Sequence, residues 1–263
     1  MRYDDIHRAL VAGTAAEVLP AWAHRLLDDV AAGRLAVAAV RHPLGFLCLP
    51  VERSGDLGVC LHIWSPEVPA APATTSPVHC HSWDLISFVL YGTVRNARAD
   101  VTEPPEPTAP QHTVPGHTTS EHTTLEQRTD QHGTAQQRIF QVVSRDGIDE
   151  LQATPRTVSC TPGDSSIHRT GDTYTLPAGV FHSTFVEGGP DAATVALGRR
   201  TPGGGDLSLG PLDVPTHRTH REPCAPDEAT RAARRAARLL ARAHTGTAHP
   251  DTAPDDVHPS ARL

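Results

Sequence analysis

Two histidines in the first half of the chain have the residue type and spacing of metal ligands. His79 and His81 are separated by one residue, and residues i and i+2 of a β-strand project from the same face. Both imidazoles would therefore point into a barrel together, at the separation that one metal ion needs. Imidazole suits Fe, Zn, Cu and Ni. The pair leads into the apolar segment 85–91, which ends at Gly92 and is typical of a buried strand.

A third histidine follows a turn signal in the second half of the chain. His182 comes three residues after Gly179 in the sequence Pro-Ala-Gly-Val-Phe-His, and the strand pattern 173–176 precedes Pro177. A tight turn of this kind can carry an imidazole across the mouth of a barrel. The sequence therefore predicts a mononuclear metal site made by His79, His81 and His182.

The rest of the chain supplies many short strand patterns and helices only at its ends. Apolar and polar residues alternate in short runs between turn residues, whereas 3–33 and 226–243 have helical spacing. This order predicts a mainly β fold, a sandwich or barrel, with N-terminal helices and a C-terminal helix. The predicted units are an N-terminal helical segment (1–36), a β-barrel (37–215), and a C-terminal helix with a disordered tail (216–263).

The segment 102–137 is predicted to be a disordered insertion in a surface loop of this barrel. It is rich in Thr, Pro, Gln and Glu and has too few apolar side chains to offset the entropy of ordering. Its four histidines are irregularly spaced, so a solvated loop is favoured over a metal site. These are His112, His117, His122 and His132.

Composition narrows the classes of partner. The net charge of -7 argues against nonspecific nucleic-acid binding, which depends on neutralising phosphates. No apolar run is long enough to cross a bilayer, and the acidic N-terminus lacks the apolar core of a signal peptide, so a cytoplasmic protein is expected. The 5 cysteines are odd in number and irregularly spaced, which argues against a disulfide framework or a structural zinc site.

The two histidine motifs together resemble those of the cupin superfamily. The family's second motif, G-x5-P-x-G-x2-H-x3-N, is matched by Gly171, Pro177, Gly179 and His182. Its final Asn is replaced by Val186. The resemblance implies a jelly-roll barrel, also called a double-stranded β-helix, and the two motifs span roughly residues 73–198.

The family's first motif, G-x5-H-x-H-x3-4-E-x6-G, is matched at His79, His81 and Gly92. Its leading Gly is replaced by Ala73, and its acidic position is Leu85. The chain therefore resembles the three-His variant found in iron cupins of the cysteine dioxygenase type. That resemblance implies Fe(II), with Zn, Ni or Mn as alternatives, and three coordination positions left for substrate and O2.

The reaction implied by this resemblance is oxygenation of a small-molecule metabolite at a non-haem Fe(II) centre, in an enzyme of the dioxygenase or related oxidoreductase type. Thiol substrates are not implied, because the strand pattern 193–197 is apolar where thiol dioxygenases alternate Ser, His and Tyr. Two other functions stay open: a non-redox metal-dependent isomerase or lyase, and a metabolite-binding cupin without catalysis. Cupins often dimerise through strands, so a homodimer is also open.

Three further residues are candidates for catalytic roles. Asp84 precedes the vacant acidic position; in a regular strand it faces away from the metal, and only a bulge would turn it inward. Arg95 could bind a carboxylate or phosphate, and Tyr174 or its neighbour Thr175 should face the pocket. His62 is favoured as a packed histidine over a fourth ligand. Other candidate wall residues are Trp83, Tyr91, Arg98, His168 and Arg169.

Overall fold

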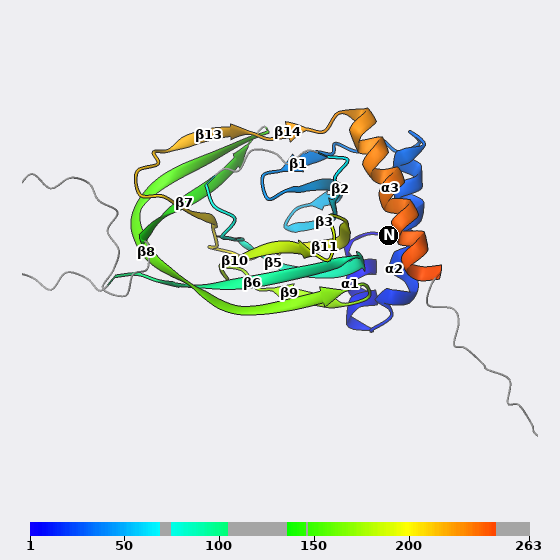
Figure 1. The fold of residues 1–263 in the computed structure, drawn as a ribbon, viewed down its shortest axis with the longest axis horizontal. Coiled ribbons are helices and arrows are strands. Elements are labelled where there is room, and N and C mark those ends of the chain that lie inside the picture. Colours follow the sequence, from blue (N-terminus) through cyan, green and yellow to red (C-terminus); the bar gives the residue numbers. More distant parts are fainter. Residues whose placement is uncertain (69–74, 105–135, 146, 246–263) are drawn as a thin grey trace, which may run out of the picture.

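The computed structural model describes residues 1–68, 75–104, 136–145 and 147–245. Most of the insertion predicted at 102–137, including its four histidines, and the tail from 246 lie outside these residues. The described chain forms three helices and fourteen strands, and every strand pairing in it is antiparallel. Two sheets of seven strands face one another (Figure 1). The predicted mainly β, jelly-roll type of fold with helices before and after it is confirmed.

The first sheet lies under the helices and is built around the hairpins near the N-terminus. Its central strands are buried on both faces, which explains the almost continuous apolar run in 192–197. Its order is β14 (Glu222–Pro223), β1 (Val40–His42), β2 (Phe46–Ser54), β3 (Leu57–Trp64), β11 (Ala192–Arg200), β5 (Trp83–Tyr91) and β9 (Thr173–Leu176).

The second sheet curls until its ends meet, because β8 pairs with β6 along its second half and with β7 along its first. This strand has 22 residues, whereas only short strands were expected, because most of its residues are polar and half-exposed. The order is β13 (His217–His220), β8 (Ile148–Arg169), β6 (Thr93–Thr102), β10 (His182–Glu187), β4 (His79–Cys80), β12 (Asp206–Gly210) and β7 (Gln136–Arg145).

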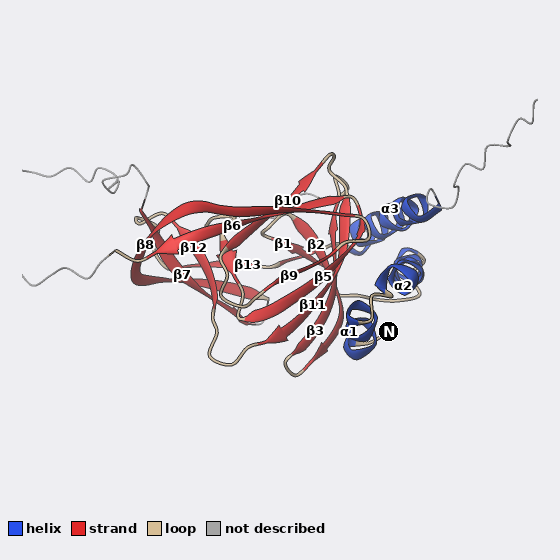
Figure 2. Ribbon diagram, turned by 90° about the horizontal axis from the view of Figure 1, so that it is seen from below, coloured by secondary structure: helices blue, strands red, loops and turns tan. Residues whose placement is uncertain are grey.

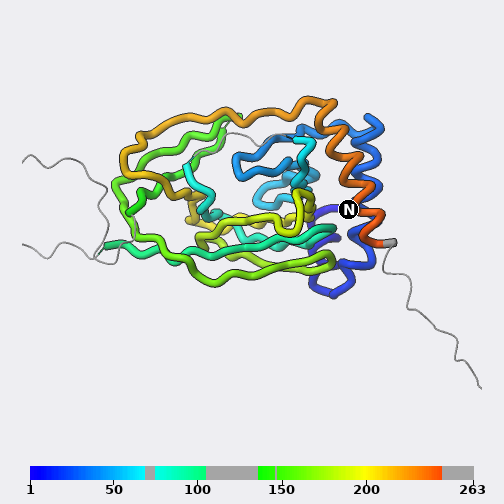
Figure 3. The backbone as a smooth tube through the Cα atoms, in the orientation of Figure 1, coloured from blue at the N-terminus to red at the C-terminus, as the bar shows by residue number. Residues whose placement is uncertain are grey.

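The three helices gather at one end of the molecule and cover the outer face of the first sheet (Figure 2). They are α1 (Tyr3–Val11), α2 (Ala15–Ala31) and α3 (Pro226–Thr245). The last helix runs beside α2 although it comes from the other end of the sequence (Figure 3). Its buried face is mostly alanine, which allows close approach to α2. The residues of that face are Ala229, Ala232, Ala233, Ala236, Ala237 and Leu240.

The turn between β5 and β6 requires glycine. Gly92 has a φ of 84°, and a β-carbon there would lie 2.5 Å from the carbonyl oxygen of Asp191. This turn sends the chain from the first sheet to the second, so it fixes how the two halves of the barrel meet.

Within the described ranges, the helices are all too short or too polar to cross a lipid bilayer.

Candidate metal site

The three predicted histidines converge in the interior of the barrel. His79 lies on β4, His182 begins β10, and the two are directly opposite each other in the strand pairing. His81 follows β4 immediately, so it lies outside the strand that its spacing suggested. One ring nitrogen from each of the three lies within 4.8 Å of the others. The strand pairing and the short segment after β4 therefore bring together all three residues.

Backbone carbonyl groups set the tautomer of two of the imidazoles. The Nδ1 atoms of His79 and His182 lie 2.9 Å from the carbonyl oxygens of Pro77 and Val180. A carbonyl oxygen only accepts hydrogen bonds, so each Nδ1 carries the proton and donates. The free lone pair is then on Nε2, which is the ligand form of the ring.

Burial keeps the cluster uncharged. It lowers the pKa of His79 to about 3, with the charge of His182 adding to the effect. Burial is also the main cause of the lowered pKa values of His81 and His182. His81 retains some solvent-accessible surface, but protein surrounds most of its ring. All three imidazoles are therefore neutral at physiological pH, as metal ligands must be.

The spacing of the ring nitrogens fits a divalent transition metal. The Nε2 atoms of His79 and His81 are 3.2 Å apart. Two nitrogens bound at about 2.0–2.1 Å to one ion, with an angle between 90° and the tetrahedral value, are separated by about 2.8–3.4 Å. No carboxylate belongs to this group within the described chain, so a bound ion would keep its charge and have open positions.

Asp84 positions the turn that carries the third histidine. Its Oδ1 accepts a hydrogen bond of 3.0 Å from the backbone N–H of Ala178, and Gly179 donates its N–H to the carbonyl oxygen of His81 at 2.9 Å. Asp84 does not join the metal group. Because β5 is regular here, Leu85 faces the interior and Asp84 does not. The two hydrogen bonds, which we call the motif clasp, join the two halves of the site.

Removing the Asp84 carboxylate should weaken metal binding without removing a ligand. We expect Asp84→Ala to raise the metal dissociation constant roughly tenfold, because a hydrogen bond to a charged group contributes about 1.5–3 kcal/mol and part of that positions His182. Asp84→Asn keeps an acceptor oxygen and should stay within about threefold of wild type. Competition with a chromophoric chelator measures both. Equal affinities for Asp84→Ala and wild type would contradict the positioning role.

An indole covers one side of the cluster. The ring of Trp83 stacks on His81 with centroids 4.3 Å apart. Gly198 makes room for it, since a β-carbon at that position would lie 2.8 Å from the indole. Trp83 thus restricts the orientation of His81. Backbone carbonyl groups orient the other two imidazoles, His79 and His182.

A pocket of about 310 Å³ lies between β9 and the strands β6 and β8, and the three histidines are not among its lining residues. Arg98 lines it and pairs directly with His182 across β6 and β10; its charge contributes to lowering the pKa of His182. Tyr174 forms another wall and stacks on His168 with centroids 4.6 Å apart. Burial raises the pKa of Tyr174, so its hydroxyl is a proton donor at neutral pH.

Arg95, the other candidate arginine, is not among the residues that line this pocket. Its Nε is 2.5 Å from a carboxylate oxygen of Glu187, and its guanidinium lies over the ring of Phe185. Neighbouring residues of a strand face opposite ways, so Arg95 is on the other face from Asn96 and Arg98. Both arginines were candidates for the pocket from the sequence. The orientation of β6 places Arg98, and not Arg95, in the pocket wall.

Sequence reasoning missed a small polar group near the Tyr174 hydroxyl. Ser87, Asn96 and Thr194 are buried around it, and their polar groups lower its pKa against the larger effect of burial. Ser87 Oγ, Asn96 Nδ2 and Thr194 Oγ1 nevertheless lack a partner with good hydrogen-bond geometry in the described chain. They come from strands of both sheets, so no local motif marks them.

The fold and the cluster define a double-sheet β-barrel with a possible three-histidine metal site. No protein-family model and no curated protein sequence matches the chain. Among solved structures, it is similar to hydroxypropylphosphonic acid epoxidase from S. wedmorenis, with 10% identity and a TM-score of 0.28 over 59% of this chain and 50% of that one. It is also similar to procruciferin, an 11S globulin from Brassica napus, with 13% identity and a TM-score of 0.28 over 71% and 34%. The chain thus spans half or less of either protein, and likeness at this level carries no argument about function.

Proposed function

We propose that the protein is a cupin-type non-haem iron(II) oxygenase that acts on a small-molecule metabolite and O2. The observation that carries this proposal is the donor set: three neutral, enclosed imidazoles and no carboxylate in the group. Iron bound there would supply O2 activation and direct binding of substrate through its open positions. Zn(II) and Ni(II) also suit imidazole ligands, and a requirement for Fe(II) and O2 distinguishes iron from both.

The residues of this chain have three roles in the proposal. His79, His81 and His182 hold the ion, and the motif clasp keeps His182 in place. The 310 Å³ pocket receives the substrate. Arg98 offers a guanidinium that pairs with an anionic group, and Tyr174 offers a protonated hydroxyl.

The proposal can be tested before the substrate is known. Protein loaded anaerobically with Fe(II) should bind nitric oxide, a stand-in for O2, and give the electron paramagnetic resonance signal of a high-spin iron nitrosyl. O2 consumption should then depend on both Fe(II) and one member of a panel of small organic acids. Iron that binds no nitric oxide would contradict the proposal. Turnover with Zn, Ni or Mn without O2 would favour a Lewis-acid reaction instead.

A further inference from the structure

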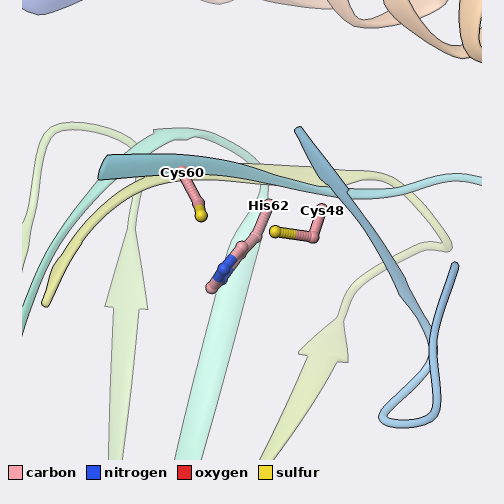
Figure 4. A group of neighbouring side chains, drawn as sticks. All are labelled: Cys48, Cys60 and His62. Atoms are coloured by element: carbon pink, nitrogen blue, oxygen red, sulfur yellow. The ribbon is translucent and has the colours of Figure 1, made fainter. Parts of the chain in front are cut away.

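A second group of metal-ligand side chains lies on the hairpin β2–β3 and shares no residue with the three-histidine cluster. Cys48, Cys60 and His62 place their sulfur and ring nitrogen atoms within 4.8 Å of one another. Figure 4 shows all three on the face of the hairpin that points away from the helices, with His62 between the two cysteines. Both cysteines are buried and free. We refer to these residues as the Cys2His cluster.

A β-bulge creates this cluster. The pairing of β2 with β3 shifts by one residue between Pro50 and Glu52, so that Cys48 lies opposite His62. Without the shift, the register that pairs Arg53 with Gly58 would place Cys48 opposite Ile63, on the face covered by the helices. The extra residue therefore turns one cysteine from the apolar core to the side of the other two ligands.

The geometry favours a shared metal ion over a disulfide. Cys60 pairs with Pro50, two residues away from Cys48, so the two cysteines are diagonal neighbours across the hairpin. Diagonal neighbours have α-carbons about 7–8 Å apart, whereas disulfides need about 4.4–6.8 Å. A metal ion can join side chains at this spacing, because two bonds of about 2.3 Å are inserted between the sulfurs.

A positively charged side chain lies beside one of the two cysteines, and an aromatic ring packs against the histidine. The Arg53 guanidinium donates a hydrogen bond to Cys60 Sγ at 3.3 Å, on the same side of the hairpin. Phe46 packs against the His62 ring with centroids 4.3 Å apart and limits its movement.

We propose that the Cys2His cluster is a second metal site, which binds Zn(II) through Cys48 Sγ, Cys60 Sγ and His62. Two thiolates and one imidazole are a zinc donor set, and they leave one tetrahedral position for a water or another small ligand. The site is chemically distinct from the three-histidine cluster. Thiolates select thiophilic ions such as Zn(II), whereas imidazoles also suit Fe, Cu and Ni. It stands whether or not the three-histidine site binds iron.

Co(II) titration of the reduced, metal-free full-length protein under anaerobic conditions tests the proposal. A Co(II)–thiolate bond gives intense near-ultraviolet charge-transfer absorption, which imidazole ligands do not give. We expect this band in wild type and in His182→Ala, and its displacement by one equivalent of Zn(II). We expect its loss in Cys48→Ser and in Cys60→Ser. Cys160→Ser, which changes a cysteine of β8 outside the cluster, should keep it.

The outcomes separate this proposal from the proposed oxygenase function. If only the three-histidine site fails to bind Co(II), wild-type protein keeps the thiolate band. Its spectrum then matches that of His182→Ala, because neither protein has Co(II) bound at the three histidines. Wild-type protein without the thiolate band overturns the second site, as does a band that persists in Cys60→Ser. Zn(II) should also slow alkylation of Cys48 and Cys60 at least tenfold in wild type, but not that of Cys160. Equal protection of all three, or of none, overturns the proposal even if the serine variants do not fold.

Discussion

Replacing His182 with alanine is expected to lower the affinity of the three-histidine site for Fe(II) by more than about 100-fold. Loss of an outer hydrogen-bond partner of a metal ligand already costs roughly 10- to 100-fold, and here a ligand itself is lost. His182 pairs with His79 across β10 and β4, so no other imidazole of the described chain occupies its place. Anaerobic chelator competition gives the affinity, and metal analysis after gel filtration gives the retained iron.

The matched control is His168→Ala. His168 lines the pocket and stacks on Tyr174, but it is not in the metal group. Its replacement should leave Fe(II) affinity within about threefold of wild type. If His182→Ala binds Fe(II) as wild type does, or if the two variants lose affinity equally, the three-histidine site is not where the metal binds.

Acidification should destabilise the metal-free protein through its buried histidines. The pKa of His79 is about 3 in the folded state and about 6.5 in an unfolded chain, so the unfolded state binds its proton first. The free energy of unfolding therefore falls as pH drops from about 6.5 towards 3. At pH 5 the loss from His79 alone is on the order of 2 kcal/mol. The lowered pKa values of His81 and His182 act in the same direction.

Urea denaturation at pH 7 and pH 5 measures this loss, and His79→Gln is the control because it fills a similar space without titrating. Carboxylates that are paired in the folded state also contribute to acid destabilisation, and they do so equally in both proteins. The informative quantity is the difference in pH dependence between wild type and His79→Gln. No difference would mean that His79 is not held neutral in the folded protein.

Local patterns were sufficient to find the three histidines and the type of fold. The His-x-His spacing and the Pro-x-Gly turn are read from neighbours in the sequence, and each predicts where a side chain points. Strand alternation also placed Asp84 outside the ligand set. The helices at both ends followed from their periodicity, and their packing on one sheet face followed only from the structure.

Other features depend on register, which no local pattern fixes. The Cys2His cluster exists because one extra residue near Pro50 shifts the pairing, and the irregular cysteine spacing gave no sign of it. Arg98 rather than Arg95 lines the pocket, because the two side chains project from opposite faces of β6. The length of β8 was missed because its polar residues are held by pairing on both sides rather than by an apolar face.

The motif clasp also has a consequence for the order of folding. Asp84 and Ala178 are 94 positions apart. The hydrogen bond between them closes a long loop, and the chain entropy is lost before the three histidines meet. Early, local hairpins such as β2–β3 do not need this closure, whereas the three imidazoles meet only after it. Metal loading at the three histidines should therefore report completion of the barrel, and a bound ion should slow its reopening more than the opening of any hairpin.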